Sequence, residues 1–132
     1  MTSFRVGIDA VSISRARKLS GHFIASYYHP DEVAKARSIG NEQLRAQYLA
    51  SRFAVKEAYC KACSKGIFDT TLREIQVVSS PSGQPSVVLH GRELERFNSA
   101  YPGGNIQVSI THEDPLAVAV VLISFGEVNV AN

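Results

Sequence analysis

The stretch from Arg52 to Ala62, RFAVKEAYCKA, gathers charged residues in a segment that otherwise has the apolar pattern of a buried helix. Glu57 and Lys61 are four residues apart, as are Arg52 and Lys56, so on a helix they form two adjacent polar rows. One carboxylate among three cations can hold a hard metal while the cations receive an anionic substrate, as phosphoryl transfer requires. The alternative is a solvated face whose i,i+4 pairs contribute about 0.3–0.5 kcal/mol each.

Two other polar residues stand in strand-like surroundings. Asp9 lies in the apolar run VGIDAV, where an unpaired carboxylate costs several kcal/mol, so we expect it to meet a cation, a donor or a metal. Its structural alternative is to cap the helix that follows. His112 closes an alternating strand at the polar turn 113–115, which is a common place for a functional side chain, although a lone histidine there is often only a surface residue.

The elements that must position these residues follow from periodicity and from capping signals. A serine precedes the first helical pattern, Pro30 opens the second, and Gly66 ends the long central one. The order is strand, three helices, hairpin, helix and hairpin, which predicts an α+β fold with an antiparallel sheet packed against helices. We expect strands at 6–11, 74–79, 86–90, 105–112 and 116–124, and helices at 12–27, 30–40, 41–66 and 91–101.

Length and charge restrict the class of protein. With 132 residues, 45% of them hydrophobic, the chain fits one domain spanning 1–132. Residues 1–65 carry a formal charge of +6 and the remainder −4, which favours an acidic partner. The basic residues are dispersed and lack an aromatic platform, so we expect no nucleic acid.

Cysteine usage and hydropathy bear on the compartment. Cys60 and Cys63 are the two cysteines, and we expect them to be small buried residues in a reducing cytoplasm. The N-terminus lacks the apolar core of a signal peptide, and no run approaches the length of a membrane span.

Three segments in register resemble the holo-acyl carrier protein synthase family of 4′-phosphopantetheinyl transferases. The family pattern is a G-x-D strand with an arginine six positions after the aspartate, a (W/F)-x-x-K-E-A-x-x-K helix and a late S-x-(S/T)-H strand. The resemblance runs from Val6 to about Val121. The matching residues are Gly7, Asp9 and Arg15, then Phe53, Lys56, Glu57, Ala58 and Lys61, then Ser109, Thr111 and His112.

The resemblance implies an enzyme that transfers the 4′-phosphopantetheine arm of coenzyme A to a serine of an acyl carrier protein, an activity of fatty acid biosynthesis. It implies that Asp9 and Glu57 are Mg²⁺ ligands and that Lys61 stabilises phosphate charge. The double-module relatives have an acid two positions after the aspartate, but this chain has Val11, as the short branch does. Glu57, His112 and a metal-bound water remain open as acceptors of the serine proton.

The resemblance also assigns residues to the coenzyme. It implies that Arg52, Lys56 and His112 neutralise the phosphates and that Ser109 and Thr111 belong to the same strand motif. Gly83, Gln84 and Pro85 resemble the G-x-P turn beside the adenine, although a hairpin with this composition needs no ligand to explain it.

The partners expected by resemblance are the carrier protein and two further copies of this chain. Arg15, Arg17, Lys18 and Phe23 are expected on the first helix, which in this family receives the acidic helix of the carrier; an ordinary amphipathic surface helix is the alternative. The short branch forms homotrimers with sites at the subunit junctions, and the apolar closing strands are consistent with this.

Two other functions compete with this interpretation. A hotdog-type acyl-coenzyme A thioesterase is also short and α+β, but it has one early central helix, whereas three helices precede the first hairpin here. A non-catalytic basic module that binds acidic proteins predicts that Asp9 and Glu57 are replaceable without loss beyond stability.

Overall fold

The computed structural model describes residues 1–66 and 70–126 and confirms the α+β class. Within these residues, no helix is long and apolar enough to cross a membrane. The elements in chain order are β1 (Thr2–Ser12), α1 (Ile13–Arg17), α2 (Gly21–Tyr27), α3 (Pro30–Ser38), α4 (Glu42–Ala62), the 3₁₀ turn η2 (Leu72–Glu74), β2 (Ile75–Ser79), β3 (Pro85–Leu89), α5 (Gly91–Ala100), β4 (Asn105–Glu113) and β5 (Leu116–Gly126).

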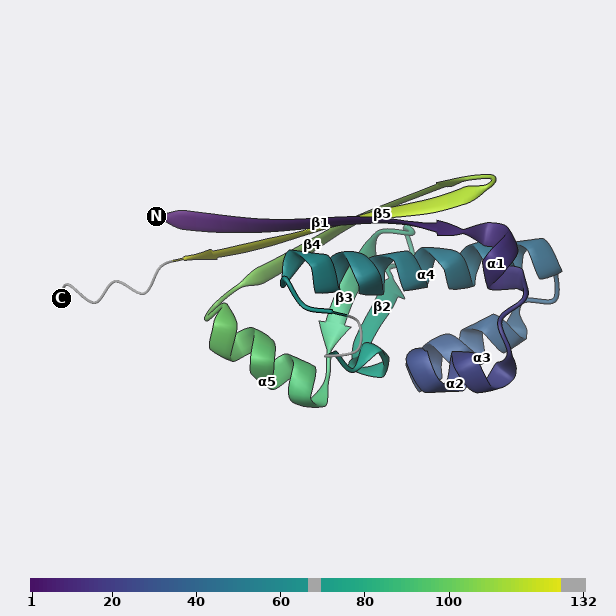
Figure 1. Cartoon of the computed structure of the whole chain (residues 1–132), viewed down its shortest axis with the longest axis horizontal. Helices are drawn as coiled ribbons and strands as arrows, with labels where there is room; N and C mark the ends of the chain where they lie inside the picture. The colour runs from purple at the N-terminus through teal and green to yellow at the C-terminus, as the bar shows by residue number, and fades with distance from the viewer. Residues whose placement is uncertain (67–69, 127–132) are drawn as a thin grey trace.

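The strands form two antiparallel sheets. The larger has the order β1-β5-β4, and β2 pairs with β3 in a separate ribbon. Figure 1 shows α4 running along one face of the larger sheet, with α1, α2 and α3 at one end and α5 at the other. In this sheet Asp9 pairs with Ala119 on β5, and His112 pairs with Ala117 on the same strand. The central strand β5 therefore separates the two functional candidates.

The close approach of α4 to the sheet depends on small residues. Ala50, Ala54 and Ala58 on α4 have no exposed surface. Opposite them, Gly7 lies so near the helix that a Cβ atom there would stand 1.9 Å from the carbonyl oxygen of Ala58. Only glycine fits at this contact, and it brings β1 and α4 to a distance at which Asp9 and Glu57 meet.

The segment expected to form one first helix forms two. The Ser12 side chain accepts a hydrogen bond from the backbone N–H of Arg15 at the start of α1, and the Ser20 side chain accepts one from Phe23 at the start of α2. Ser20 thus supplies a second N-cap that ends the continuity of the helix. As a result, Phe23 lies on a different helix from Arg15.

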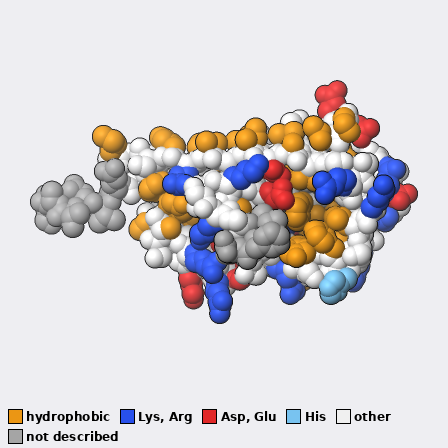
Figure 2. Space-filling view, viewed as in Figure 1, with side chains coloured by type: hydrophobic (Ala, Val, Ile, Leu, Met, Phe, Trp, Pro, Cys, Tyr) orange, Lys and Arg blue, Asp and Glu red, His pale blue; other side chains and the backbone are white. Residues whose placement is uncertain are grey.

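The outer face of the larger sheet is apolar and uncovered. Phe4, Val6 and Ile8 on the edge strand β1 are 63%, 65% and 58% exposed. Figure 2 shows hydrophobic side chains in a row along the upper edge of the molecule, where this sheet lies. We call these residues and their neighbours on β5, Val118, Val120 and Leu122, the outer sheet face.

Candidate active site

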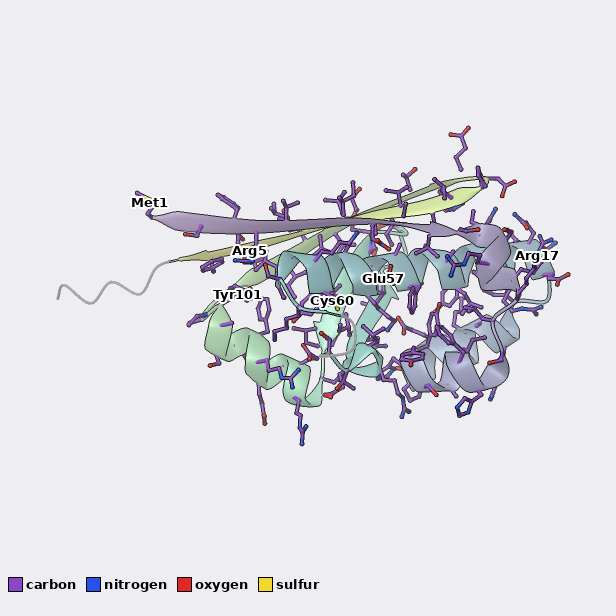
Figure 3. The ribbon with its side chains drawn as sticks, in the orientation of Figure 1. Met1, Arg5, Arg17, Glu57, Cys60 and Tyr101 are labelled. Atoms are coloured by element: carbon purple, nitrogen blue, oxygen red, sulfur yellow. The ribbon has the colours of Figure 1, made fainter. Side chains whose placement is uncertain are left out.

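Asp9 and Glu57 meet where β1 crosses α4, and Lys61 lies one helical turn beyond Glu57. The Lys61 ammonium donates to Asp9 Oδ1 at 2.9 Å and to the backbone carbonyl oxygen of Ile8 at 3.1 Å. The side chain of Lys61 is 59% exposed while that of Asp9 is 11% exposed. Figure 3 shows Glu57 near the middle of α4 on the side visible there. Asp9 thus pairs with a cation, as expected for a carboxylate in an apolar strand. The alternative that Asp9 caps the following helix is wrong, because Ser12 is the N-cap of α1.

The surroundings of Glu57, which include the Asp9 carboxylate, disfavour its charged form. Burial, followed by the hydrogen bond and the charge of Asp9, raises the pKa of Glu57 to about 8, against smaller opposing effects of Lys61 and Arg15. The second oxygen of Asp9, Oδ2, is buried and has no hydrogen-bond partner. A buried oxygen without a partner beside a second carboxylate fits a divalent cation with oxygen ligands.

The number of protein ligands at this place is small. Among the residues described, no group of three or more His, Cys, Asp or Glu side chains could hold a metal ion. A metal ion held here by Asp9 and Glu57 would have two carboxylate ligands and would take its remaining ligands from water and substrate oxygens, as is usual for Mg²⁺ at phosphate sites.

A separate cationic hollow of about 340 Å³ lies between α4, the β2–β3 turn and β4. Arg52, Gly83, Pro85 and His112, four of the residues predicted to bind the coenzyme, line it together, and their part in binding stays a prediction. Arg52 donates to the hydroxyl of Ser79 at 2.8 Å, and its guanidinium lies 4.3 Å from the centre of the Tyr48 ring. The Nε–H of Arg52 is buried without a partner. The guanidinium is therefore held in place beside the hollow, and its Nε–H donor is not used by another of the residues described.

Four predicted coenzyme residues are not among those that line this hollow, and three of them, Gln84, Ser109 and Thr111, are exposed. Gln84 is exposed in the turn, where its backbone bonds to Ser80. Ser109 and Thr111 are exposed on β4 at positions that alternate with the inward Val108 and Ile110, so they share the outer sheet face. Their part in coenzyme binding stays a prediction.

Lys56 is contrary to expectation a core residue. Its side chain has no exposed surface, and its ammonium lies 2.8 Å from Glu32 and donates to the carbonyl oxygens of Leu72 and Ile75 at 2.9 and 2.5 Å. A ligand cannot reach a side chain so enclosed, so the geometry contradicts the prediction that Lys56 contacts a phosphate.

The sequence reasoning missed Glu32, the partner of Lys56. This carboxylate is 1% exposed and also accepts from the backbone N–H groups of His29 and Val77, both at 2.9 Å. It joins α3, α4 and β2 through one side chain. The capping position of Glu32 in the first turn of α3 was the visible signal, but it does not reveal contacts with β2 and α4.

A second hollow, of about 240 Å³, lies beside Glu57. Arg15 stands at it, and its walls are largely apolar, with Leu19, Phe23 and Phe53 among the lining residues. Of the other predicted docking residues, Arg17 bonds to Gln43 on α4, and Lys18 is exposed at the C-cap of α1. The predicted docking residues therefore gather at the α1–α2 end, although they do not share one helix.

The carboxylate pair and the cationic hollow lie on opposite edges of the sheet in one chain. Asp9 is on β1 and His112 is on β4, with β5 between them, which is a separation of about 10 Å from two strand spacings. Neither Asp9 nor Glu57 lines the cationic hollow. The carboxylate pair and the cationic hollow are therefore separate from each other in one chain.

Comparison with known proteins identifies the class to which this arrangement belongs. Residues 5–121 match the family model described as the 4′-phosphopantetheinyl transferase superfamily, so the chain belongs to that family. A holo-[acyl-carrier-protein] synthase of Nitrobacter hamburgensis is 38% identical over 128 residues, covering 90% of this chain and 92% of the relative. The enzyme of that name from Treponema pallidum is 36% identical over 120 residues, covering 89% and 93%.

Solved structures agree in fold. The holo-[acyl-carrier-protein] synthase of Helicobacter pylori in complex with coenzyme A has a TM-score of 0.72 and 28% identity, covering 89% of this chain and 98% of that one. The resemblance that the three motifs indicated is confirmed, and the thioesterase alternative is not supported.

Proposed function

We propose that this protein transfers the 4′-phosphopantetheine arm of coenzyme A to a serine of an apo-acyl carrier protein. The serine oxygen attacks the β-phosphorus of the pyrophosphate, the bond to the bridging oxygen breaks, and adenosine 3′,5′-bisphosphate leaves while the serine proton passes to a base. The single observation that carries the proposal is the Asp9–Glu57 pair with Lys61 beside it, in a chain that belongs to this transferase family.

Asp9 and Glu57 would hold Mg²⁺, which neutralises charge on the pyrophosphate oxygens when it is bound. The orphaned Oδ2 of Asp9 supports this assignment. Lys61 is exposed and tethered by Asp9, so its ammonium is positioned to stabilise the charge that develops on phosphate.

Arg52 and His112 would bind the phosphates of coenzyme A at the cationic hollow, with Gly83 and Pro85 bordering the adenine. The hollow contains an arginine whose guanidinium is fixed by Ser79 and Tyr48, and charge-assisted bonds from such a group to phosphate are the stronger kind. The holo-[acyl-carrier-protein] synthase of Helicobacter pylori has been solved in complex with coenzyme A.

The carrier protein would dock at the hollow beside Glu57. An acidic helix that reaches Arg15 and Lys18 and places an apolar side chain against Phe23 brings its serine next to Glu57, because Glu57 lines the same hollow. Charge steers such an approach and the apolar centre supplies the contact area.

A homotrimer would bring the Asp9–Glu57 pair of one copy and the cationic hollow of its neighbour together as the two halves of one active site. The outer sheet face leaves Phe4, Val6 and Ile8 exposed, and an apolar patch of this kind marks an interaction surface. A cyclic arrangement that buries it brings the carboxylate edge of one copy near the cationic edge of the next, and Ser109 and Thr111 then lie at the junction. Each chain acts as one domain, and its two buried, free cysteines fit a reducing cytoplasm.

The test of the activity is to incubate the protein with Mg²⁺, coenzyme A and an apo-acyl carrier protein and to weigh the carrier. We expect the carrier to gain the mass of one phosphopantetheinyl group, and we expect Asp9→Asn and Glu57→Gln each to abolish the gain while the protein stays folded. Full activity in excess chelator refutes the metal assignment.

The test of the shared site is complementation. Glu57→Gln should be inactive alone, and Arg52→Ala should be strongly impaired at coenzyme A concentrations below its raised KM. Mixing the two under these conditions should restore part of the activity, because hybrid trimers contain junctions with both intact halves. A fully active monomer by light scattering refutes the model.

A further inference from the structure

A groove of about 330 Å³ lies between α2, α3 and α4, away from the two hollows described above. Its apolar walls come from Ile24 on α2 and from Val33 and Ala36 on α3, and Gly21 stands at its edge. Two arginines, Arg37 and Arg45, complete the lining, and no acidic residue lines it. The groove thus combines an apolar floor with a positive rim.

The two arginines differ in how they are held. Arg45 donates to the carbonyl oxygen of Ile39 at 3.2 Å and is partly buried, so it is fixed beside the groove. Arg37 is exposed in the last turn of α3. The helix α2 itself carries no lysine, arginine, aspartate or glutamate, so the positive charge on this side of α2 comes from α3 and α4.

Helix α2 lies between this groove and the hollow beside Glu57. Phe23 lines the hollow while its neighbour Ile24 lines the groove, and successive residues of a helix point about 100° apart. A helix with its side chains is about 10 Å wide. A protein partner of ordinary size covers about 800 Å² on each side, a patch about 28 Å across. A partner whose serine reaches Glu57 therefore extends past α2.

We propose that the α2–α3 groove is a second contact for the acidic carrier protein, which would seat an apolar side chain flanked by carboxylates between Arg37 and Arg45. This inference rests on the proposed function. It extends the docking surface beyond α1 and gives Arg37 and Arg45 a role in carrier recognition. The carrier would then contact both sides of α2, at the hollow beside Glu57 and at the groove. Two contacts fix the orientation of the carrier's serine in addition to attracting the carrier.

The experiment compares steady-state kinetics of four proteins in full-length form: wild type, Arg37→Glu, Gly21→Leu and Arg92→Glu. Arg92→Glu is the matched control, because it makes the same charge change at an exposed site on α5, at the other end of the molecule. Gly21→Leu tests the groove itself, since a Cβ at Gly21 meets nothing within 4 Å and the leucine side chain can occupy the groove mouth.

We expect Arg37→Glu to raise the KM for the carrier about fivefold at low salt and less than about twofold at high salt, because salt screens the lost attraction. Gly21→Leu should raise the same KM at both salt concentrations. Neither variant should change the KM for coenzyme A, and Arg92→Glu should match wild type.

The possible results distinguish a failure of the proposed function from a failure of the groove proposal. A wild-type protein that adds no mass to the carrier refutes the proposed function. A wild-type protein that transfers the arm, with Arg37→Glu indistinguishable from Arg92→Glu, refutes only the groove. A change of oligomeric mass in Arg37→Glu, measured by light scattering, also refutes it, because the groove would then belong to the assembly.

Discussion

Gly7 is the place where strand β1 comes closest to helix α4, and Gly7→Ala should separate the two. The added Cβ would stand 1.9 Å from the Ala58 carbonyl oxygen and 2.7 Å from the Ala62 backbone nitrogen, both main-chain atoms that cannot rotate away. Ordinary contact begins near 3.4 Å, so the backbones must part by about 1.5 Å.

A shift of this size reaches the active site, because Asp9 is two residues along the same strand. The Lys61–Asp9 contact of 2.9 Å would lengthen beyond hydrogen-bond range, and the Asp9–Glu57 pair would open. Overpacking of this kind costs about 1–3 kcal/mol, and a misplacement of 1 Å in a catalytic constellation costs about a hundredfold in rate. We expect Gly7→Ala to show both losses.

Urea unfolding measures the first loss, and the mass-based transfer assay at a temperature where the variant is folded measures the second. Gly40→Ala is the matched control, because a Cβ at Gly40 meets nothing within 4 Å. If Gly7→Ala keeps wild-type stability and wild-type turnover, the close-packing argument is wrong.

Three further variants test individual side chains. Glu57→Gln should stabilise the metal-free protein near pH 8 but not near pH 4.5, because the pKa of Glu57 is raised from an ordinary 4.5 to about 8 and the stability of the wild type therefore falls as pH rises between these values. Thermal unfolding in chelator measures the difference in stability, and a difference that does not change with pH contradicts this reasoning. Lys56→Met should lower the free energy of unfolding by about 3–5 kcal/mol in urea titrations, since Glu32 is left buried without its cation, and Lys56→Met/Glu32→Leu should recover part of this loss. If Lys56→Met alone destabilises the protein by much less, the Lys56–Glu32 ion pair does not have the structural role given to it here. Arg52→Ala should raise the KM for coenzyme A about tenfold or more, the value of a hydrogen bond to a charged group, and an unchanged KM removes Arg52 from the coenzyme site.

The sequence by itself predicted the order of the elements, except that residues 12–27 form two helices and not one, and it proposed the residues that would carry the chemistry. Hydrophobic periodicity placed α4 and the closing hairpin to within a few residues, because these long segments bury one face along their whole length. The spacing of Asp9, Glu57 and His112 within three motifs indicated the transferase family, which the comparisons confirm.

Only the tertiary structure decided which cation of α4 faces the core and which faces the site. Lys56 and Lys61 lie on the same helix, but their surroundings differ. Lys56 pairs with the buried carboxylate of Glu32 from α3, whereas Lys61 pairs with Asp9 from β1 at the surface. The burial of a charge depends on a partner brought from elsewhere in the chain, which local sequence does not encode. The separation of Asp9 on β1 from His112 on β4 by the strand β5 follows likewise from strand order, a property of the folded chain.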